Sequence, residues 1–205
     1  MDAEEFRQIS NVSRETFEKL VLYSELLVKW QSKINLVGKN TVSDLWCRHM
    51  LDSIQIIKRI PKEANIITDF GSGAGFPGLA LAIVCEKTVH LIEASKKKSA
   101  FLREAARITQ APVVLHEGRV EEQEAWPSDV ITARAVAPLS RLIVYAKPFV
   151  KKNTICLFLK GAHVEEELTE AKKTWKMKVK RHQSITHPKG VILFIKDIAY
   201  DPSFR

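Results

Sequence analysis

The stretch Asp69-Phe70-Gly71-Ser72-Gly73-Ala74-Gly75-Phe76-Pro77-Gly78 decides the fold. It follows a short apolar segment rich in isoleucine, residues 65–70, and runs into a second apolar segment, residues 77–85. Four glycines within eight residues allow backbone conformations that other residues avoid, and they let a ligand approach the main chain. An ordinary strand–helix turn needs only one glycine. The stretch therefore predicts a buried strand, a cofactor-binding loop and a helix, in that order.

The segments after this loop continue the alternation of strand and helix. Further strands are predicted over residues 88–92, 113–116, 129–133, 154–159, 176–184 and 191–198, and helices over residues 95–109, 139–150 and 164–175. This order indicates an α/β fold, with a mostly parallel sheet and helices on both of its faces. A short turn joins the last two strands, so they form an antiparallel hairpin at one edge.

Helical patterns dominate the chain before the loop. Apolar residues recur at helical spacing over residues 13–32, with Ser13 as the N-cap, and a second helix is expected between Ser43 and Pro61. We therefore predict an N-terminal helical cap over residues 1–60 and a cofactor-binding domain over residues 61–205, forming a single compact unit.

Composition limits the kind of protein. The chain has 205 residues, of which 45% are hydrophobic and 27% charged, as is typical of globular domains. Cys47, Cys85 and Cys156 are too few and too scattered for a disulfide framework or a zinc site, so we expect no metal. The longest apolar run, residues 78–85, is about a third of a membrane-spanning helix, and the N-terminus is acidic. We expect no membrane segment and no export signal, and hence a cytoplasmic protein.

Positive charge is concentrated in the last third of the sequence. The whole chain has 32 basic and 24 acidic residues, whereas residues 131–205 contain 15 and 6. Lys176, Lys178 and Lys180 alternate along one predicted strand, so its outer face is basic. Two interpretations stay open: a phosphate-binding surface for RNA, or lysines that prevent this edge strand from pairing with other sheets.

Two carboxylates bear on the identity of the cofactor. Asp69, at the tip of the first strand, suits the sulfonium and ammonium groups of S-adenosylmethionine and would repel a pyrophosphate. Glu93, at the end of the second strand, can accept hydrogen bonds from ribose hydroxyls. Gly73, Gly75 and Gly78 also satisfy the dinucleotide pattern G-x-G-x-x-G. An NAD(P)-dependent oxidoreductase is therefore an alternative, and a non-enzymatic RNA-binding module is another.

Further motifs give the sequence a family resemblance. They are Ile34-Asn35-Leu36-Val37, Arg48-His49-x-x-Asp52-Ser53, the Phe76-Pro77-Gly78 ending of the loop, Ala133-Arg134-Ala135 and Leu159-Lys160-Gly161. With them the chain resembles the RsmG (GidB) family of bacterial small-subunit ribosomal RNA guanine-N7 methyltransferases. The resemblance implies a class I (Rossmann-like) methyltransferase fold, with seven strands in the order 3-2-1-4-5-7-6. It also implies transfer of a methyl group from S-adenosylmethionine to a guanine of that RNA, by an enzyme that is expected to be a monomer.

The resemblance, together with the residue chemistry above, gives roles to single positions. The expected cofactor-binding residues are Asp69, Gly71, Gly73, Phe76, Glu93, Val120, Glu121 and Arg134. Arg134 is also expected to position the reacting groups, and Lys160, Lys176, Lys178 and Lys180 to bind the RNA. No general base is expected, because guanine N7 carries no proton.

Competing interpretations of two of these side chains stay open. Arg134 could instead form an internal salt bridge with Asp69 or Glu93, and Lys160 could be a solvated loop lysine. His49 is given no catalytic role.

Overall fold

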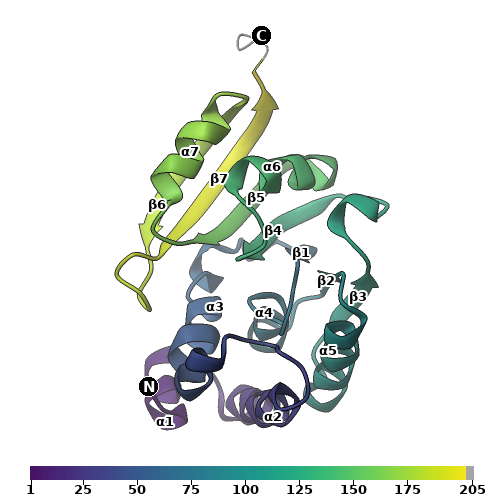
Figure 1. The fold of residues 1–205 in the computed structure, drawn as a ribbon, viewed down its shortest axis with the longest axis vertical. Helices are drawn as coiled ribbons and strands as arrows, with labels where there is room; N and C mark the ends of the chain where they lie inside the picture. The colour runs from purple at the N-terminus through teal and green to yellow at the C-terminus, as the bar shows by residue number, and fades with distance from the viewer. Residues whose placement is uncertain (202–205) are drawn as a thin grey trace.

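The computed structural model describes residues 1–201 of the chain, and its centre is one sheet of seven strands (Figure 1). The strands are β1 (Ile67–Phe70), β2 (Val89–Glu93), β3 (Val113–Glu117), β4 (Ser128–Arg134), β5 (Val150–Lys160), β6 (Trp175–Gln183) and β7 (Val191–Tyr200). They lie in the order β3-β2-β1-β4-β5-β7-β6, and β7 is antiparallel to both of its neighbours. The predicted strand order and the terminal hairpin are confirmed.

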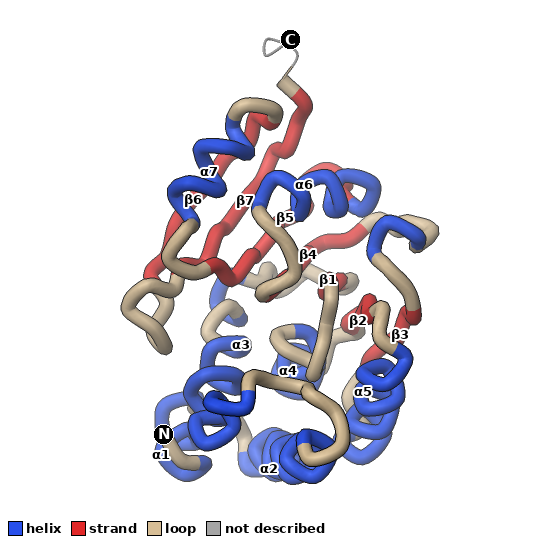
Figure 2. The backbone as a smooth tube through the Cα atoms, viewed as in Figure 1, coloured by secondary structure: helices blue, strands red, loops and turns tan. Residues whose placement is uncertain are grey.

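Helices cover both faces of the sheet (Figures 1 and 2). The α-helices are α1 (Ala3–Ser10), α2 (Arg14–Gln31), α3 (Asp52–Ile54), α4 (Gly78–Cys85), α5 (Lys96–Thr109), α6 (Leu139–Ala146) and α7 (Val164–Lys172). The first five lie on one side of the sheet, and α6 and α7 lie on the other. Each side has its own hydrophobic core. None of the helices in residues 1–201 combines the length and the hydropathy that a membrane crossing requires.

Several predicted helix boundaries are confirmed by their caps. The Ser13 hydroxyl accepts a hydrogen bond from the Thr16 amide at 3.1 Å, and the Ser95 hydroxyl accepts one from the Lys98 amide at 3.4 Å. Helix α1 was not predicted, although Asp2 and Glu5 form a capping box at its start. A short amphipathic helix with one buried apolar residue, Phe6, gives little periodic signal.

The prediction of a single helix between Ser43 and Pro61 is wrong. The chain forms short pieces instead: a 3₁₀ segment at Lys39–Asp44, a π-helical turn at Trp46–Leu51, α3, and a second 3₁₀ turn at Ile57–Arg59. The helix expected over residues 139–150 is also too long, since Pro148 lacks the amide needed to continue it.

The N-terminal helices pack on the cofactor loop. Tyr23, fully buried on α2, donates a hydrogen bond to the carbonyl of Ala74, and its ring lies 5.3 Å from that of Phe76. Residues before position 60, such as Leu27 and Met50, share one hydrophobic core with residues of α4, α5 and the sheet. The cap therefore forms one wall of the predicted site.

Candidate active site

The loop between β1 and α4 is built from glycines in left-handed backbone conformations. The φ angles of Gly71, Gly73 and Gly75 are 60°, 59° and 97°. A Cβ atom on Gly75 would lie 2.6 Å from the hydroxyl of Tyr23, and one on Gly71 would lie 2.8 Å from a methyl of Val136. These glycines are needed because the loop is enclosed by neighbouring elements as well as strained in its backbone.

Glu93 holds this loop to the end of β2. One carboxylate oxygen, Oε2, accepts a hydrogen bond from the Gly73 amide at 2.7 Å, and Oε1 accepts one from the Ser95 amide at 2.8 Å. The residue is only 7% exposed. Each carboxylate oxygen keeps a further lone pair, so Glu93 can still accept hydrogen bonds from a ligand.

A cavity of about 240 Å³ lies beside the loop, and we call it the loop cavity. It is lined by Gly71, Ile92, Ala94, Gly118, Arg119, Val120, Glu121, Val136, Ala137, Arg141 and Tyr145. Val120 is buried, whereas the exposed Glu121 accepts a hydrogen bond from the Tyr145 hydroxyl at 3.3 Å. The lining includes the positive-φ Gly71 and an apolar side wall, and Glu93 lies in the chain between the lining residues Ile92 and Ala94. This arrangement fits a nucleoside cofactor. Contact of Val120 and Glu121 with adenine stays a prediction.

Asp69 lies beneath the loop and not on its surface. It is completely buried, and its Oδ1 accepts a hydrogen bond from the Thr132 hydroxyl at 2.6 Å. Burial raises the pKa of Asp69 to about 6, against the opposing effect of hydrogen bonds from Thr132, Ser72 and the Gly78 backbone. In this structure Asp69 therefore supports the loop from below, and its direct contact with a ligand stays a prediction.

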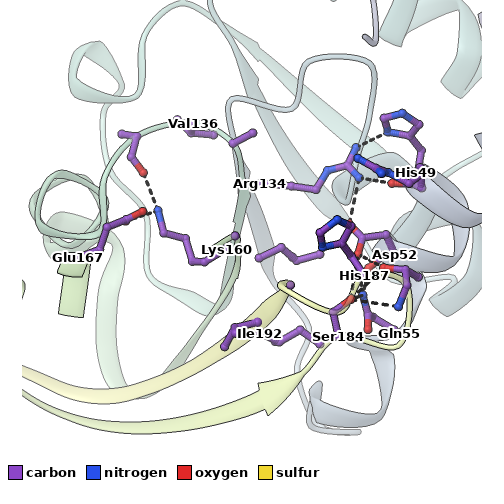
Figure 3. Close-up of a pocket in the computed structure, with 18 of the residues that line it drawn as sticks. His49, Asp52, Gln55, Arg134, Val136, Lys160, Glu167, Ser184, His187 and Ile192 are labelled. Carbon is purple, nitrogen blue, oxygen red and sulfur yellow. Dashed lines mark hydrogen bonds and ion pairs between the residues drawn. The ribbon is translucent and has the colours of Figure 1, made fainter. Parts of the chain in front are cut away.

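Arg134, at the end of β4, ties the sheet to the cap (Figure 3). Its Nη1 donates to the carbonyl of Arg48 at 3.0 Å and to Asp52 Oδ2 at 3.1 Å, while Nη2 donates to His49 Nδ1 at 2.9 Å. The guanidinium also lies over the ring of Phe76, 5.2 Å from its centre. An internal salt bridge is confirmed, but its partner is Asp52 and not Asp69 or Glu93.

These contacts fix the protonation state of His49. Because Nδ1 accepts from Arg134, the ring proton is on Nε2, which donates to the Thr41 hydroxyl at 2.8 Å. That hydroxyl donates in turn to the carbonyl of Gly38 at 2.7 Å. Burial, followed by the charges of Arg134 and Arg48, lowers the pKa of His49 to about 3. The ring is thus neutral near pH 7 and has no free nitrogen for acid–base work.

Asp52 joins the cap to the turn between β6 and β7. Its Oδ1 accepts hydrogen bonds from the Thr186 hydroxyl at 2.6 Å and from Gln55 Nε2 at 2.8 Å. Gln55 Oε1 accepts one from the Ile185 amide at 2.9 Å. Sequence reasoning missed Gln55 and Thr186, since no local motif marks a contact between the cap and a turn more than a hundred positions away.

A larger cavity of about 660 Å³ opens at these contacts, and we call it the strand-tip cavity (Figure 3). Its walls include Arg48, His49, Asp52, Gln55, Arg134, Val136, Ala137, Leu159, Lys160, Glu167, Ser184, Thr186, His187 and Ile192. Val136 and Ala137 line both cavities, which therefore adjoin at the residues just after Arg134.

Lys160 is part of the wall of the strand-tip cavity and is not a solvated loop lysine. Its side chain is 8% exposed. Its Nζ contacts Glu167 Oε2 at 2.5 Å and donates to the carbonyl of Ala137 at 2.9 Å. The structure thus brings Lys160 and Arg134 to one cavity, and their binding of substrate stays a prediction.

The three lysines of β6 lie elsewhere. Lys176, Lys178 and Lys180 are exposed on the edge strand, and within residues 1–201 none of them lines either cavity. Lys176 pairs with Asp201 at 3.2 Å and Lys178 with Asp197 at 2.8 Å. They form a surface apart from both cavities, and their contact with RNA stays a prediction.

Comparisons with a family model and with individual relatives point to the same protein family. A model of the family GidB, described as rRNA small subunit methyltransferase G, matches residues 16–194. The chain is 49% identical to the ribosomal RNA small subunit methyltransferase G of Paramagnetospirillum magneticum, with 97% of each chain covered. It is 50% identical to the protein of the same name from Rhodospirillum rubrum, over 97% of this chain and 98% of that one.

Solved structures agree on the fold. An O-methyltransferase from Bacillus cereus, crystallised with SAH, superposes with a TM-score of 0.58 over 85% of this chain and 90% of that one. At 14% identity this likeness shows the class I methyltransferase fold alone. The sequence matches carry the closer relationship: the chain belongs to the GidB family, the ribosomal RNA small subunit methyltransferases G.

Proposed function

We propose that this protein transfers a methyl group from S-adenosylmethionine to N7 of a guanine in small-subunit ribosomal RNA. The observation that carries the proposal is the shared wall of the two cavities at Val136 and Ala137. The loop cavity has the size for the nucleoside part of the cofactor, and the strand-tip cavity has room for a base. A ligand in each would meet at the tip of β4.

S-adenosylmethionine supplies an electrophilic methyl group, and the protein has to align the guanine with it and exclude water. Guanine N7 has an in-plane lone pair and no proton, so no base is required. This agrees with His49, which is neutral and has both ring nitrogens engaged. Arg134 is held rigidly by three cap residues, and its place beside Phe76 is suited to orienting the groups that react.

Membership of the family disfavours the NAD(P)-dependent oxidoreductase. The intact glycine loop and Glu93 disfavour a non-enzymatic RNA-binding module. We propose further that the enzyme acts as a cytoplasmic monomer on the RNA or on a partly assembled small subunit.

Mapping of N7-methylguanine tests the proposed function. Small-subunit RNA from cells that lack this protein is expected to lose one N7-methylguanine, and a copy of the gene should restore it. Purified protein with S-adenosylmethionine should methylate the same guanine in RNA from cells that lack the protein. An identical methylation map with and without the protein would exclude the proposal.

The lysines of β6 give a separate prediction about RNA affinity. Changing Lys176, Lys178 and Lys180 together to glutamine should weaken RNA binding for all sequences. Each lost phosphate contact reduces the slope of log affinity against log salt by roughly 0.7–0.9. Affinity for S-adenosylmethionine should not change, because these side chains lie on the far edge of the sheet. RNA-binding titrations at several salt concentrations measure the slope.

The matched control replaces Lys29, Lys33 and Lys62, which are also exposed but lie outside β6. It removes the same charge and should leave the slope closer to that of the wild type. An unchanged slope in the β6 variant, together with new aggregation, would favour the other interpretation, in which these lysines protect the edge strand.

A further inference from the structure

Glu167 is a carboxylate in the wall of the strand-tip cavity. It lies on α7, and its side chain is 24% exposed. Its Oε2 contacts Lys160 Nζ at 2.5 Å and accepts a hydrogen bond from the Leu139 amide at 2.6 Å. Within residues 1–201 the structure gives Oε1 no hydrogen bond. One oxygen is thus fully engaged, and the other is free to accept from a ligand.

Lys160 has a similar spare capacity. An ammonium has three N–H donors, and the contacts with Glu167 and with the carbonyl of Ala137 use two of them. The third donor and the free oxygen of Glu167 belong to two side chains in contact with each other. The cavity wall therefore offers a hydrogen-bond donor beside a hydrogen-bond acceptor (Figure 3).

The other carboxylate among the described residues of this cavity, Asp52, does not have this capacity. Its Oδ2 accepts from Arg134, and its Oδ1 accepts from Thr186 and Gln55. Asp52 is therefore occupied in holding the cap and the turn, and Glu167 is the carboxylate available to a base.

We propose that Lys160 and Glu167 together select guanine, an inference that rests on the proposed function. A guanine whose N7 faces the cofactor presents O6 next to N7, and then N1–H and the 2-amino group. Lys160 donates to O6, as lysine commonly does, and Glu167 Oε1 accepts from N1–H and the 2-amino group. Adenine presents an amino group where guanine has O6, and an unprotonated N1 next to it. Both contacts would then be repulsive, so the pair would reject adenine.

Glu167 also has a structural contact, the hydrogen bond from the Leu139 amide at the start of α6. A loss of activity on mutation would not separate this contact from base selection. Glu167→Gln keeps an amide oxygen for Leu139 and Lys160, but it turns an N–H₂ group toward the base in place of Oε1. The readout must therefore be the choice between bases and not the rate alone.

The experiment compares two RNA fragments that contain the target guanine mapped with the wild-type protein. One fragment carries guanine at that position, and the other carries inosine, which lacks the 2-amino group but keeps N7, O6 and N1–H. The wild type should prefer guanine in kcat/KM by about tenfold or more, the effect of one hydrogen bond to a charged group. Glu167→Gln should lower kcat/KM for guanine about 10- to 100-fold and bring the ratio of guanine to inosine close to one.

Two more variants complete the test. Glu166→Gln changes the neighbouring glutamate, whose side chain is 81% exposed, and should keep the wild-type ratio. Glu167→Asp keeps the charge but withdraws the carboxylate by one carbon, so it should also lose the preference for guanine over inosine. This second variant still tests the inference if Glu167→Gln folds poorly.

The outcomes separate this inference from the proposed function. A wild type that methylates the guanine fragment but shows no preference over inosine overturns the role of Glu167 and leaves the methyl transfer standing. So does a ratio that is the same in wild type and in both Glu167 variants. A wild type that methylates neither fragment at N7 overturns the proposed function itself.

Discussion

Replacing Arg134 by alanine is expected to lower the rate of methyl transfer about a hundredfold while the protein stays folded. A displacement of about 1 Å at a reacting centre costs roughly this much. Arg134 is the side chain that fixes the β4 tip against Arg48, His49 and Asp52, so its loss frees that tip to move. Single-turnover methylation of the RNA, measured beside thermal unfolding, tests both parts of this expectation.

The stability cost of Arg134→Ala should be small. Losing one charged hydrogen-bonding side chain costs about 1–3 kcal/mol, and each kcal/mol lowers the Tm of a chain of this size by about 2–4 °C. Arg134→Lys should recover little activity, because lysine lacks the planar fork that reaches three acceptors at once. Arg103→Ala, which breaks an exposed ion pair between α5 and β3, serves as the control. A collapse of the Tm in step with activity would make Arg134 a structural residue only.

Replacing Glu93 by alanine should weaken binding of S-adenosylmethionine about 10- to 100-fold. The variant loses a carboxylate that can bind the ribose hydroxyls, and losing a charged hydrogen bond costs about 1.5–3 kcal/mol. It also releases the Gly73 and Ser95 amides that Glu93 holds, so the loop is less well ordered before binding. Isothermal calorimetry with S-adenosylmethionine measures the affinity directly.

Glu117 offers a matched control for Glu93. It occupies the paired position at the end of the neighbouring strand β3, but its exposed carboxylate contacts Arg103. Glu117→Ala should leave the affinity for S-adenosylmethionine unchanged. Undiminished affinity in Glu93→Ala would remove Glu93 from the cofactor site.

Local signals were sufficient for the fold class. The glycine loop, the alternation of strand and helix and the short final turn each lie within a few residues, and together they predict a mostly parallel α/β sheet with a terminal hairpin, whereas the correct strand order came from the family resemblance. Glu93 follows from its place at the end of the second strand, since residues at the carboxyl ends of parallel strands meet at one edge of the sheet, whereas Arg134 was identified through the family resemblance.

The rest of the site depends on contacts between distant residues. Asp52 is the salt-bridge partner of Arg134, 82 positions away, and no spacing rule connects them. Asp69 was expected at the ligand because it ends a strand, but the following helix and Thr132 enclose it completely. Whether a strand-end carboxylate faces a cavity or the interior is decided by side chains on other elements.

The contact of Asp52 with Thr186 also sets when, during synthesis, the site is completed. The two residues are 134 positions apart, so the wall that they form cannot close until residue 186 of 205 has been added. The glycine loop and the strands beside it are made much earlier, but a domain generally folds as a unit, so their early synthesis does not by itself complete the site. Full activity therefore begins only when the last hairpin is translated and docks on the cap.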